Sequence, residues 1–183
     1  MSKAKRIGVF GSSFDPPHLG HVAVIEDLLH KKLFDEIWLM PVFKHAFGKK
    51  LAPFEERLAF LKALQEHIPD PALKVTSIEK ELNLNPSYTV DVLKALVQKH
   101  PDAAFHLILG SDCRKDLPKW KDSNTLQQLC DFYFIPRPGH ESSPYPDISS
   151  TQIRKAAQAG QDLSTMTLPE IARLIADHKL YRE

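Results

Sequence analysis

The chain has 183 residues, of which 43% are hydrophobic, and its 24 Lys and Arg nearly balance its 23 Asp and Glu, giving a net charge of +1. This composition excludes an intrinsically disordered chain, and the balanced charge disfavours a surface that coats a polyanion, so we expect no nucleic acid partner. The length suits one compact domain over residues 1–183 better than two domains. The two cysteines, Cys113 and Cys130, lie far apart without a metal-binding pattern, so we expect reduced, buried thiols.

The start of the chain is basic, with Lys3, Lys5 and Arg6, but the apolar run at 7–10 is too short for a signal peptide or a membrane span. We therefore expect a cytoplasmic protein that does not associate with a membrane. The sequence leaves a homo-oligomer open.

Short apolar runs alternate along the chain with segments of helical periodicity. We expect strands at 7–10, 36–42, 73–78, 105–109 and 132–135, and helices at 18–29, 54–64, 89–98, 150–159 and 168–179. Such alternation predicts an α/β fold, a Rossmann-like doubly wound parallel sheet with helices on both faces and a ligand crevice at the carboxyl ends of the strands. Functional residues should therefore follow strands. The Pro- and Gly-rich segment 136–146 is expected to be a mobile surface loop.

The segment GSSFDPPHLGH at 11–21 follows the first expected strand and opens the first expected helix. A helix start offers free backbone N–H groups and the positive end of the helix dipole, and small residues before it let an anion approach. His18 and His21 are three residues apart, so their imidazoles should lie on the same side and add donors. The segment matches neither the P-loop nor the dinucleotide pattern, so it predicts a different phosphate site.

The segment ISSTQIR at 148–154 is a second helix start. Ser149, Ser150 or Thr151 can cap this helix, its free N–H groups can meet phosphates, and Arg154 can add a forked donor one turn further on. The alternative is an ordinary capped helix with a solvated Arg154. That alternative is less favoured because the same short chain also contains the first motif.

These two segments carry a resemblance to a known family. FDPPHLGH at 14–21 resembles the His-x-Gly-His signature of the nucleotidyltransferase superfamily, and ISSTQIR at 148–154 resembles its second signature. From about residue 7 to 156 the chain resembles the nicotinate mononucleotide adenylyltransferases. The resemblance implies transfer of AMP from ATP to the 5′-phosphate of nicotinate mononucleotide, which forms deamido-NAD and pyrophosphate in NAD biosynthesis. Gly11-Ser12 stands where the family usually has Gly-Gly, and we expect this to change the loop slightly without loss of activity.

The resemblance also carries expectations for single residues. It implies catalytic roles for His18, His21 and Arg154 and a nucleotide site with the members Gly11, Ser12, Ser13, Phe14, His18, His21, Gly110, Asp112, Arg137, Ser150, Thr151 and Arg154. It implies a mononucleotide site with Lys49, Tyr88, Thr89 and Trp120.

The chemistry of these side chains suits the implied roles. Trp120 offers a π face to a pyridinium ring, the helix start at Thr89 suits a carboxylate, and Asp112 can accept hydrogen bonds from ribose hydroxyls. The loop at 41–50 departs from the family's Pro-Pro-His-Lys, so a solvated basic loop stays open as the alternative for Lys49.

The implied reaction needs no general base, because a phosphate monoester is largely dianionic at neutral pH. We expect His21 at the α-phosphate of ATP, with His18 and Arg154 on the β- and γ-phosphates. Mg²⁺ should arrive bound to ATP, since the sequence shows no acidic cluster for a dedicated metal site. Two alternatives stay open: another member of the superfamily, such as a phosphopantetheine adenylyltransferase or a cytidylyltransferase, and a non-catalytic nucleotide-binding module that regulates a partner.

Overall fold

A computed structural model of the chain describes residues 4–45, 48–139 and 141–182. Its strands are β1 (Lys5–Ser12), β2 (Glu36–Pro41), β3 (Leu73–Val75), β4 (Ala103–Gly110) and β5 (Asp131–Ile135). They form one five-stranded sheet in the order β3-β2-β1-β4-β5, and every neighbouring pair is parallel. The predicted parallel sheet is therefore confirmed.

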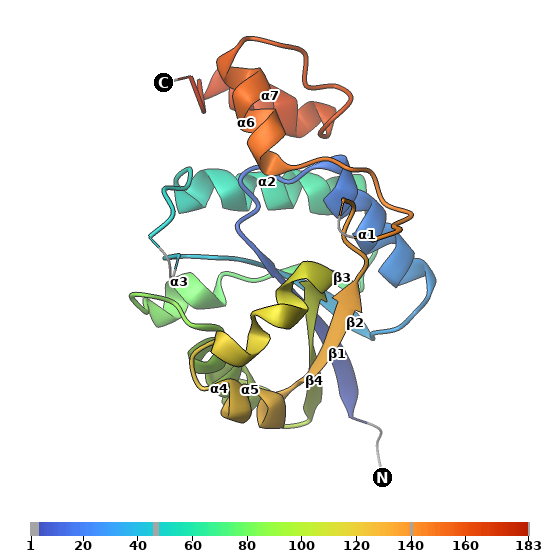
Figure 1. Ribbon diagram of the computed structural model, residues 1–183, viewed down its shortest axis with the longest axis vertical. Helices are drawn as coiled ribbons and strands as arrows, with labels where there is room; N and C mark the ends of the chain where they lie inside the picture. Colours follow the sequence, from blue (N-terminus) through green and yellow to red (C-terminus); the bar gives the residue numbers. More distant parts are fainter. Residues whose placement is uncertain (1–3, 46–47, 140, 183) are drawn as a thin grey trace.

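Helices cover both faces of this sheet (Figure 1). They are α1 (Leu19–His30), α2 (Phe54–His67), α3 (Ile78–Leu82), α4 (Thr89–Lys99), α5 (Ser123–Leu129), α6 (Ser150–Gln158) and α7 (Pro169–Asp177), with 3₁₀ turns η1 (Ser111–Lys115) and η2 (Leu117–Lys119). One buried cluster joins α1, α2, α6 and α7 to one sheet face, and a second joins α3, α4 and α5 to the other. On β4, Ile108 belongs to the first cluster, whereas its neighbours Leu107 and Leu109 belong to the second. This alternation is the period of two that a sheet buried on both faces requires.

Several elements differ from the sequence prediction. The strand expected at 73–78 ends at Val75, and Ile78 begins the short helix α3, because one apolar run supplies both a strand and a buried helix start. The first strand, expected at 7–10, runs from Lys5 to Ser12 and so includes the first two residues of the motif. Helix α5 and the two 3₁₀ turns were not predicted, since they are too short to show a clear period.

No helix in the described part of the chain combines the length and apolar character that crossing a bilayer requires.

The order of the strands in the sheet indicates where a ligand crevice should lie. Connections run outward from β1 in one direction through β2 and β3, and in the other through β4 and β5, so the order reverses between β1 and β4. At such a reversal the loops after the two strands diverge and leave space at their carboxyl ends. The segment after β1 is the first motif, and the segment after β4 begins with Ser111 and Asp112. The α6–α7 region packs beyond α2, at the end of the molecule opposite the N-terminus (Figure 1).

We expect Leu64→Ala to lower the free energy of unfolding by about 2–5 kcal/mol, because Leu64 is fully buried between α2 and the sheet and its removal leaves a cavity. Lys62→Ala, at an exposed position of the same helix, should change stability by less than about 0.5 kcal/mol. Denaturant unfolding of both variants measures the difference. Equal stabilities for the two variants would contradict the assignment of Leu64 to the core.

Candidate active site

A pocket of about 220 Å³ lies at the reversal point between β1 and β4. Both strand ends and the start of α1 form its walls, and the segment after β5 closes it. Its lining includes Phe10, Gly11, Ser12, His18, Gly20, His21, Ile108, Gly110, Cys113, Ile135, Arg137, Tyr145 and Ile148. The predicted crevice at the carboxyl ends of the strands is present, and it contains the first motif.

His18 and His21 lie together at the start of α1. Their ring centroids are 3.8 Å apart, and the backbone N–H of His18 donates to Nδ1 of His21 at 3.1 Å. Because Nδ1 of His21 accepts this bond, the proton of the neutral ring is on Nε2 and is available as a donor. The expectation that the two imidazoles share one side of the helix start is confirmed.

The His21 ring is more enclosed than a surface turn would make it. It packs against Phe14, at 5.1 Å between ring centroids, and against Phe10 at 5.9 Å. His21 therefore contributes to packing as well as to the pocket lining.

Gly20 lets the first histidine lie close to the helix. A Cβ atom at position 20 would be 2.9 Å from Nδ1 of His18 and 3.3 Å from the carbonyl oxygen of Pro146. Either contact is tighter than side chains normally tolerate, so the ring or the loop would have to move. The glycine of the motif is thus required by close approach, and its φ angle is helical like that of its neighbours.

Burial keeps both histidines neutral in the free protein. It lowers the pKa of His18 to about 4, with a smaller contribution from the positive charge of Arg137. Burial also lowers the pKa of His21 well below its ordinary value, and His18 and Arg137 add to this effect. At neutral pH the two rings therefore act as hydrogen-bonding groups, and the positive charge at the pocket wall comes from Arg137.

The segment after β4 supplies an acceptor beside this charge. Oδ1 of Asp112 is buried and has no hydrogen-bond partner among the described residues, while Oδ2 lies 3.8 Å from Nε of Arg137. The backbone N–H of Arg137 in turn donates to Oγ of Ser111. Asp112 does not line the pocket itself, but its carboxylate lies against Gly110 and Arg137, which do, and its unpaired oxygen suits the ribose role expected for it.

The second motif forms the start of α6. Ser149 caps the helix, since its Oγ accepts a bond from the backbone N–H of Gln152 at 3.2 Å. Ser150 instead donates to the carbonyl oxygen of Pro16 at 2.8 Å, and Thr151 is exposed. The motif is therefore tied directly to the first one.

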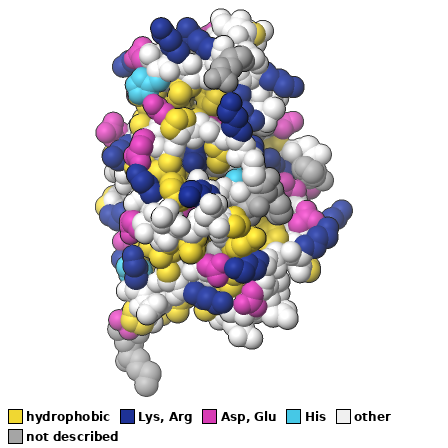
Figure 2. Space-filling model, turned by 90° about the vertical axis from the view of Figure 1, so that its left-hand side faces the viewer, with side chains coloured by type: hydrophobic (Ala, Val, Ile, Leu, Met, Phe, Trp, Pro, Cys, Tyr) yellow, Lys and Arg dark blue, Asp and Glu magenta, His cyan; other side chains and the backbone are white. Residues whose placement is uncertain are grey.

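Arg154 does not lie in the pocket beside the histidines. Its guanidinium donates to the carbonyl oxygen of Asp15 at 2.7 Å and to Oγ1 of Thr151 at 3.0 Å. It lines a neighbouring groove of about 650 Å³, to which Lys50, Lys155, Lys179 and Arg182 also contribute. On the face that carries the C-terminal end, Lys and Arg side chains surround a hollow (Figure 2). The phosphate role of Arg154 stays a prediction.

Ser13 and Phe14, two further predicted nucleotide residues, do not line the pocket either. Phe14 is 1% exposed and belongs to the core, where it adopts a positive φ of 47°. The carbonyl oxygen of Ser13 is bound by Arg57. Gly11, Ser12 and Gly110 do line the pocket.

Three of the four predicted mononucleotide residues, Tyr88, Thr89 and Trp120, lie on the side of α4. Tyr88 is the residue before this helix and makes no side-chain capping bond, and Thr89 is its first residue. Tyr88 and Trp120 are half-buried and pack against the same cluster of buried residues. Lys49 is exposed. These four residues do not line the histidine pocket, so their role stays a prediction.

Apart from Arg137, the sequence reasoning missed the wall formed by the segment after β5. Tyr145 lines the pocket, and its hydroxyl donates to Oδ2 of Asp27 at 2.7 Å, while Oγ of Ser143 donates to the carbonyl oxygen of Pro136. The Pro and Gly content indicated a loop but gave no sign that it closes a pocket. Cys113 is half-buried in the same lining, whereas Cys130 is buried in the core as expected.

The chain is similar to several known proteins. The cytidylyltransferase-like family matches residues 9–156. A probable nicotinate-nucleotide adenylyltransferase of Myxococcus xanthus is 36% identical, over 99% of this chain and 97% of the relative. The nicotinate-nucleotide adenylyltransferase of Bacillus subtilis is 31% identical, over 97% of this chain and 98% of the relative.

Solved structures give the same fold. A putative nicotinate-nucleotide adenylyltransferase from Vibrio parahaemolyticus has a TM-score of 0.78 and 27% identity, over 98% of this chain and 96% of that one. A Plasmodium falciparum nicotinic acid mononucleotide adenylyltransferase complexed with NaAD, at 22% identity, shares the fold with a TM-score of 0.78 over 97% of both chains.

A parallel sheet with helices on both faces and a pocket at its order reversal defines a protein of the Rossmann-like class. Together with the comparisons, this shows that the chain belongs to the cytidylyltransferase-like family and, within it, to the nicotinate-nucleotide adenylyltransferases. The predicted resemblance is confirmed.

We expect the His18 imidazole to titrate with a midpoint of about 4 in the free protein, so that it is neutral at pH 7. Arg137→Gln should raise this midpoint by a small amount, because removing a positive charge favours the protonated ring while burial, the larger cause, remains. NMR titration of the histidine side chains measures both values. A His18 midpoint near 6.5 would contradict the enclosed site.

Proposed function

We propose that this chain transfers AMP from ATP to the 5′-phosphate of nicotinate mononucleotide. The observation that carries the proposal is the pair of neutral, enclosed histidines at the order reversal of the sheet, beside the cation of Arg137. An oxygen of the mononucleotide phosphate forms a bond to the α-phosphorus of ATP. The bond from that phosphorus to the bridging oxygen breaks, and pyrophosphate leaves with the electron pair. The products are deamido-NAD and pyrophosphate.

The residues of the pocket suit this displacement. Nε2–H of His21 can donate to an oxygen of the α-phosphate, where negative charge gathers as pyrophosphate departs. Because the nucleophile is already an anion, neither histidine has to accept a proton, which agrees with pKa values lowered by burial. Alignment and charge stabilisation are then the contributions of the protein.

We propose that Mg²⁺ enters as part of the nucleotide substrate. Within the described residues, no group of three or more His, Cys, Asp or Glu side chains could hold a metal ion, and no Asp or Glu lines the histidine pocket. Mg²⁺ keeps several waters and binds phosphate oxygens readily, so a nucleotide-borne ion fits this lining.

We also propose that residues 1–183 act as one nucleotidyltransferase domain in the cytoplasm. Support for one domain comes from α6 and the segment before α7, whose Ser150 and Thr167 donate to the carbonyl oxygens of Pro16 and Pro17 in the first motif. A part of the chain that anchors the catalytic loop is not expected to fold apart from it.

We expect His21→Asn to lower kcat by two or more orders of magnitude, since loss of one transition-state donor costs about 3 kcal/mol. Asparagine is preferred to alanine because the His21 ring packs against Phe10 and Phe14, and a smaller residue would also remove packing. The measurement is pyrophosphate release with ATP and nicotinate mononucleotide. His30→Asn, at an exposed position of the same helix, is the matched control. Near-normal turnover of a folded His21→Asn protein would remove His21 from the mechanism.

We expect nicotinate mononucleotide to be used better than nicotinamide mononucleotide by a few-fold to about thirtyfold in kcat/KM. The start of α4 carries no side-chain cap, so its N–H groups and dipole favour a carboxylate by about 0.3–2 kcal/mol. The two acceptors are compared at fixed ATP and magnesium. If nicotinamide mononucleotide were used better, the role of Thr89 would be refuted, whereas the proposed adenylyl transfer would stand.

The same assay separates the alternatives. Pyrophosphate release only with 4′-phosphopantetheine would indicate another member of the superfamily. ATP binding without pyrophosphate release on any acceptor would indicate a regulatory nucleotide-binding module.

A further inference from the structure

The loop between β1 and α1 is held by donors from distant parts of the chain. The carbonyl oxygens of Ser13, Asp15, Pro16 and Pro17 each accept a hydrogen bond from a side chain. The donors are Arg57 from α2, Arg154 and Ser150 from α6, and Thr167 from the segment before α7, at 2.7–3.0 Å. We call residues 13–17 the motif loop. Its backbone is therefore fixed from outside, and three of its four fixed carbonyls depend on the C-terminal third of the chain.

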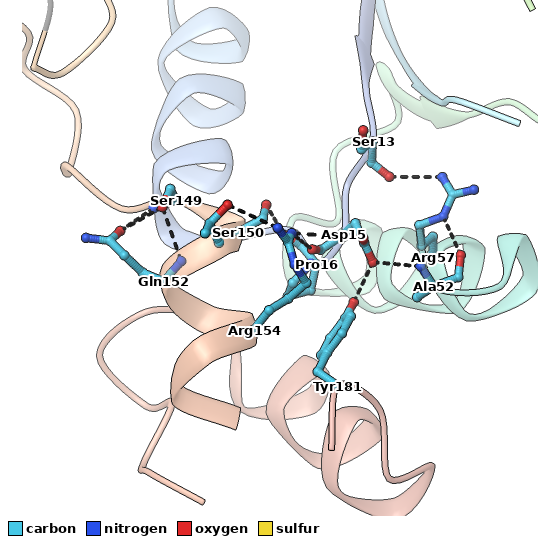
Figure 3. A network of polar contacts seen from close by, with 11 residues as sticks. Ser13, Asp15, Pro16, Ala52, Arg57, Ser149, Ser150, Gln152, Arg154 and Tyr181 are labelled. Carbon is cyan, nitrogen blue, oxygen red and sulfur yellow. Dashed lines mark hydrogen bonds and ion pairs between the residues drawn. The ribbon is translucent and has the colours of Figure 1, made fainter. Parts of the chain in front are cut away.

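Asp15 is the side chain through which this loop meets the end of the chain (Figure 3). It is only 1% exposed, and its Oδ1 accepts the hydroxyl of Tyr181 at 2.7 Å and the backbone N–H of Ala52 at 3.2 Å. Its Oδ2 lies 3.9 Å from the guanidinium of Arg154. A buried carboxylate needs such partners, because an unsatisfied one costs several kcal/mol. The hydrogen bond from the Tyr181 hydroxyl is the shortest of these contacts to the carboxylate.

Two residues near the end of the chain have positive φ angles. Lys179, at 53°, closes the C-terminus of α7, where the backbone N–H of Leu180 donates to the carbonyl oxygen of Ile175. Tyr181, which contacts Asp15, has a φ of 64°, in the left-handed region that residues other than glycine rarely enter. Such conformations persist where surrounding contacts impose them. The Tyr181 side chain is half-buried, and burial together with the nearby Asp15 charge raises the pKa of its hydroxyl. The hydroxyl therefore keeps its proton and remains a donor.

The arrangement connects the last residues of the chain to the catalytic histidines. Asp15 is followed by Pro16, Pro17 and then His18, and proline has a fixed φ, so a shift of Asp15 passes along a stiff segment. The position of the His18 and His21 rings determines the alignment of the phosphates, and displacements of about 1 Å can cost up to a hundredfold in rate.

We propose that Tyr181 is a positioning residue for the adenylyl transfer: through its hydrogen bond to Asp15 it holds the motif loop, and thereby His18 and His21, in the reactive arrangement. This inference rests on the proposed function where it is tested by the rate of adenylyl transfer. The contacts of Asp15 can also be tested in the free protein, without that reaction. Tyr181 lines the groove that contains Arg154 and not the histidine pocket, so it acts through Asp15.

The first test compares Tyr181→Phe with His178→Gln in the full chain. The first change removes only the hydroxyl that Asp15 accepts. The second removes another contact of the same tail, between His178 and Glu56 of α2 at 2.6 Å, which does not touch the motif loop. We expect Tyr181→Phe to lower kcat about tenfold with little change in KM for the mononucleotide, and His178→Gln to leave kcat unchanged. An unchanged kcat in Tyr181→Phe, or an equal loss in both variants, would overturn the proposal.

A double-mutant cycle then tests whether Tyr181 acts through Asp15. We expect the kcat of Tyr181→Phe/Asp15→Ala to equal that of Asp15→Ala alone, because alanine has no side-chain oxygen to accept the hydroxyl of Tyr181. Additive losses would overturn the coupling. If Asp15→Ala does not fold, the comparison of Tyr181→Phe with His178→Gln still decides the proposal.

An NMR measurement keeps this inference separate from the proposed function. In the free protein, Tyr181→Phe should shift the side-chain signals of His18 and His21, whereas His178→Gln should not. If the unmodified chain fails to use nicotinate mononucleotide, the proposed function fails while the histidine shifts still test the role of Tyr181. If turnover is normal and neither the signals nor kcat respond to Tyr181→Phe, the inference alone fails.

Discussion

The carbonyl oxygens of the motif loop impose the main constraint on this structure. A loop that lies against the protein cannot leave its backbone acceptors unpaired, and water has little access to them. Arg57 satisfies one of these acceptors and, in addition, donates to the carbonyl oxygens of Val42 at 2.7 Å and Ala52 at 3.0 Å, so it joins the segments that follow β1 and β2. Arg57 is 1% exposed, and its burial lowers the pKa of the guanidinium against the opposing effect of Asp15. The remaining acceptors tie the α6–α7 region to the motif loop, and buried side chains of the same region, such as Ile153 and Ile171, also belong to the core cluster on that face of the sheet.

The same enclosure decides the electrostatics of the site. Because the histidines are packed against Phe10, Phe14 and each other, they are neutral before the nucleotide binds. A triphosphate would bring negative charge next to them and favour protonation, so their hydrogen-bonding strength would grow where the anion sits. A neutral pair also repels Arg137 less than a charged pair would, which lets three nitrogen-rich side chains share one small pocket.

Most of the architecture could be read from the sequence. Alternating strand and helix periods gave the parallel sheet, and the motif at 11–21 was placed at the strand end where the pocket lies. The errors have a common cause: a segment of only a few residues is too short to show whether its apolar residues repeat with the period of a strand or of a helix. The run at 73–78 looks like one strand because Val75 and Ile78 are both apolar, yet they belong to β3 and α3, and α5 has too few turns to show a face.

The sequence by itself determined which residue types could handle phosphate and which helix starts could present them. It did not determine that Arg154 turns to the carbonyl of Asp15, that Tyr145 closes the pocket, or that Tyr181 reaches back across 166 residues to Asp15. Those facts depend on which donors and acceptors meet when distant segments pack together. A local pattern records the conformation of its own segment, whereas the partner of a buried polar group is chosen by the tertiary fold, because burial is what makes an unpaired group costly.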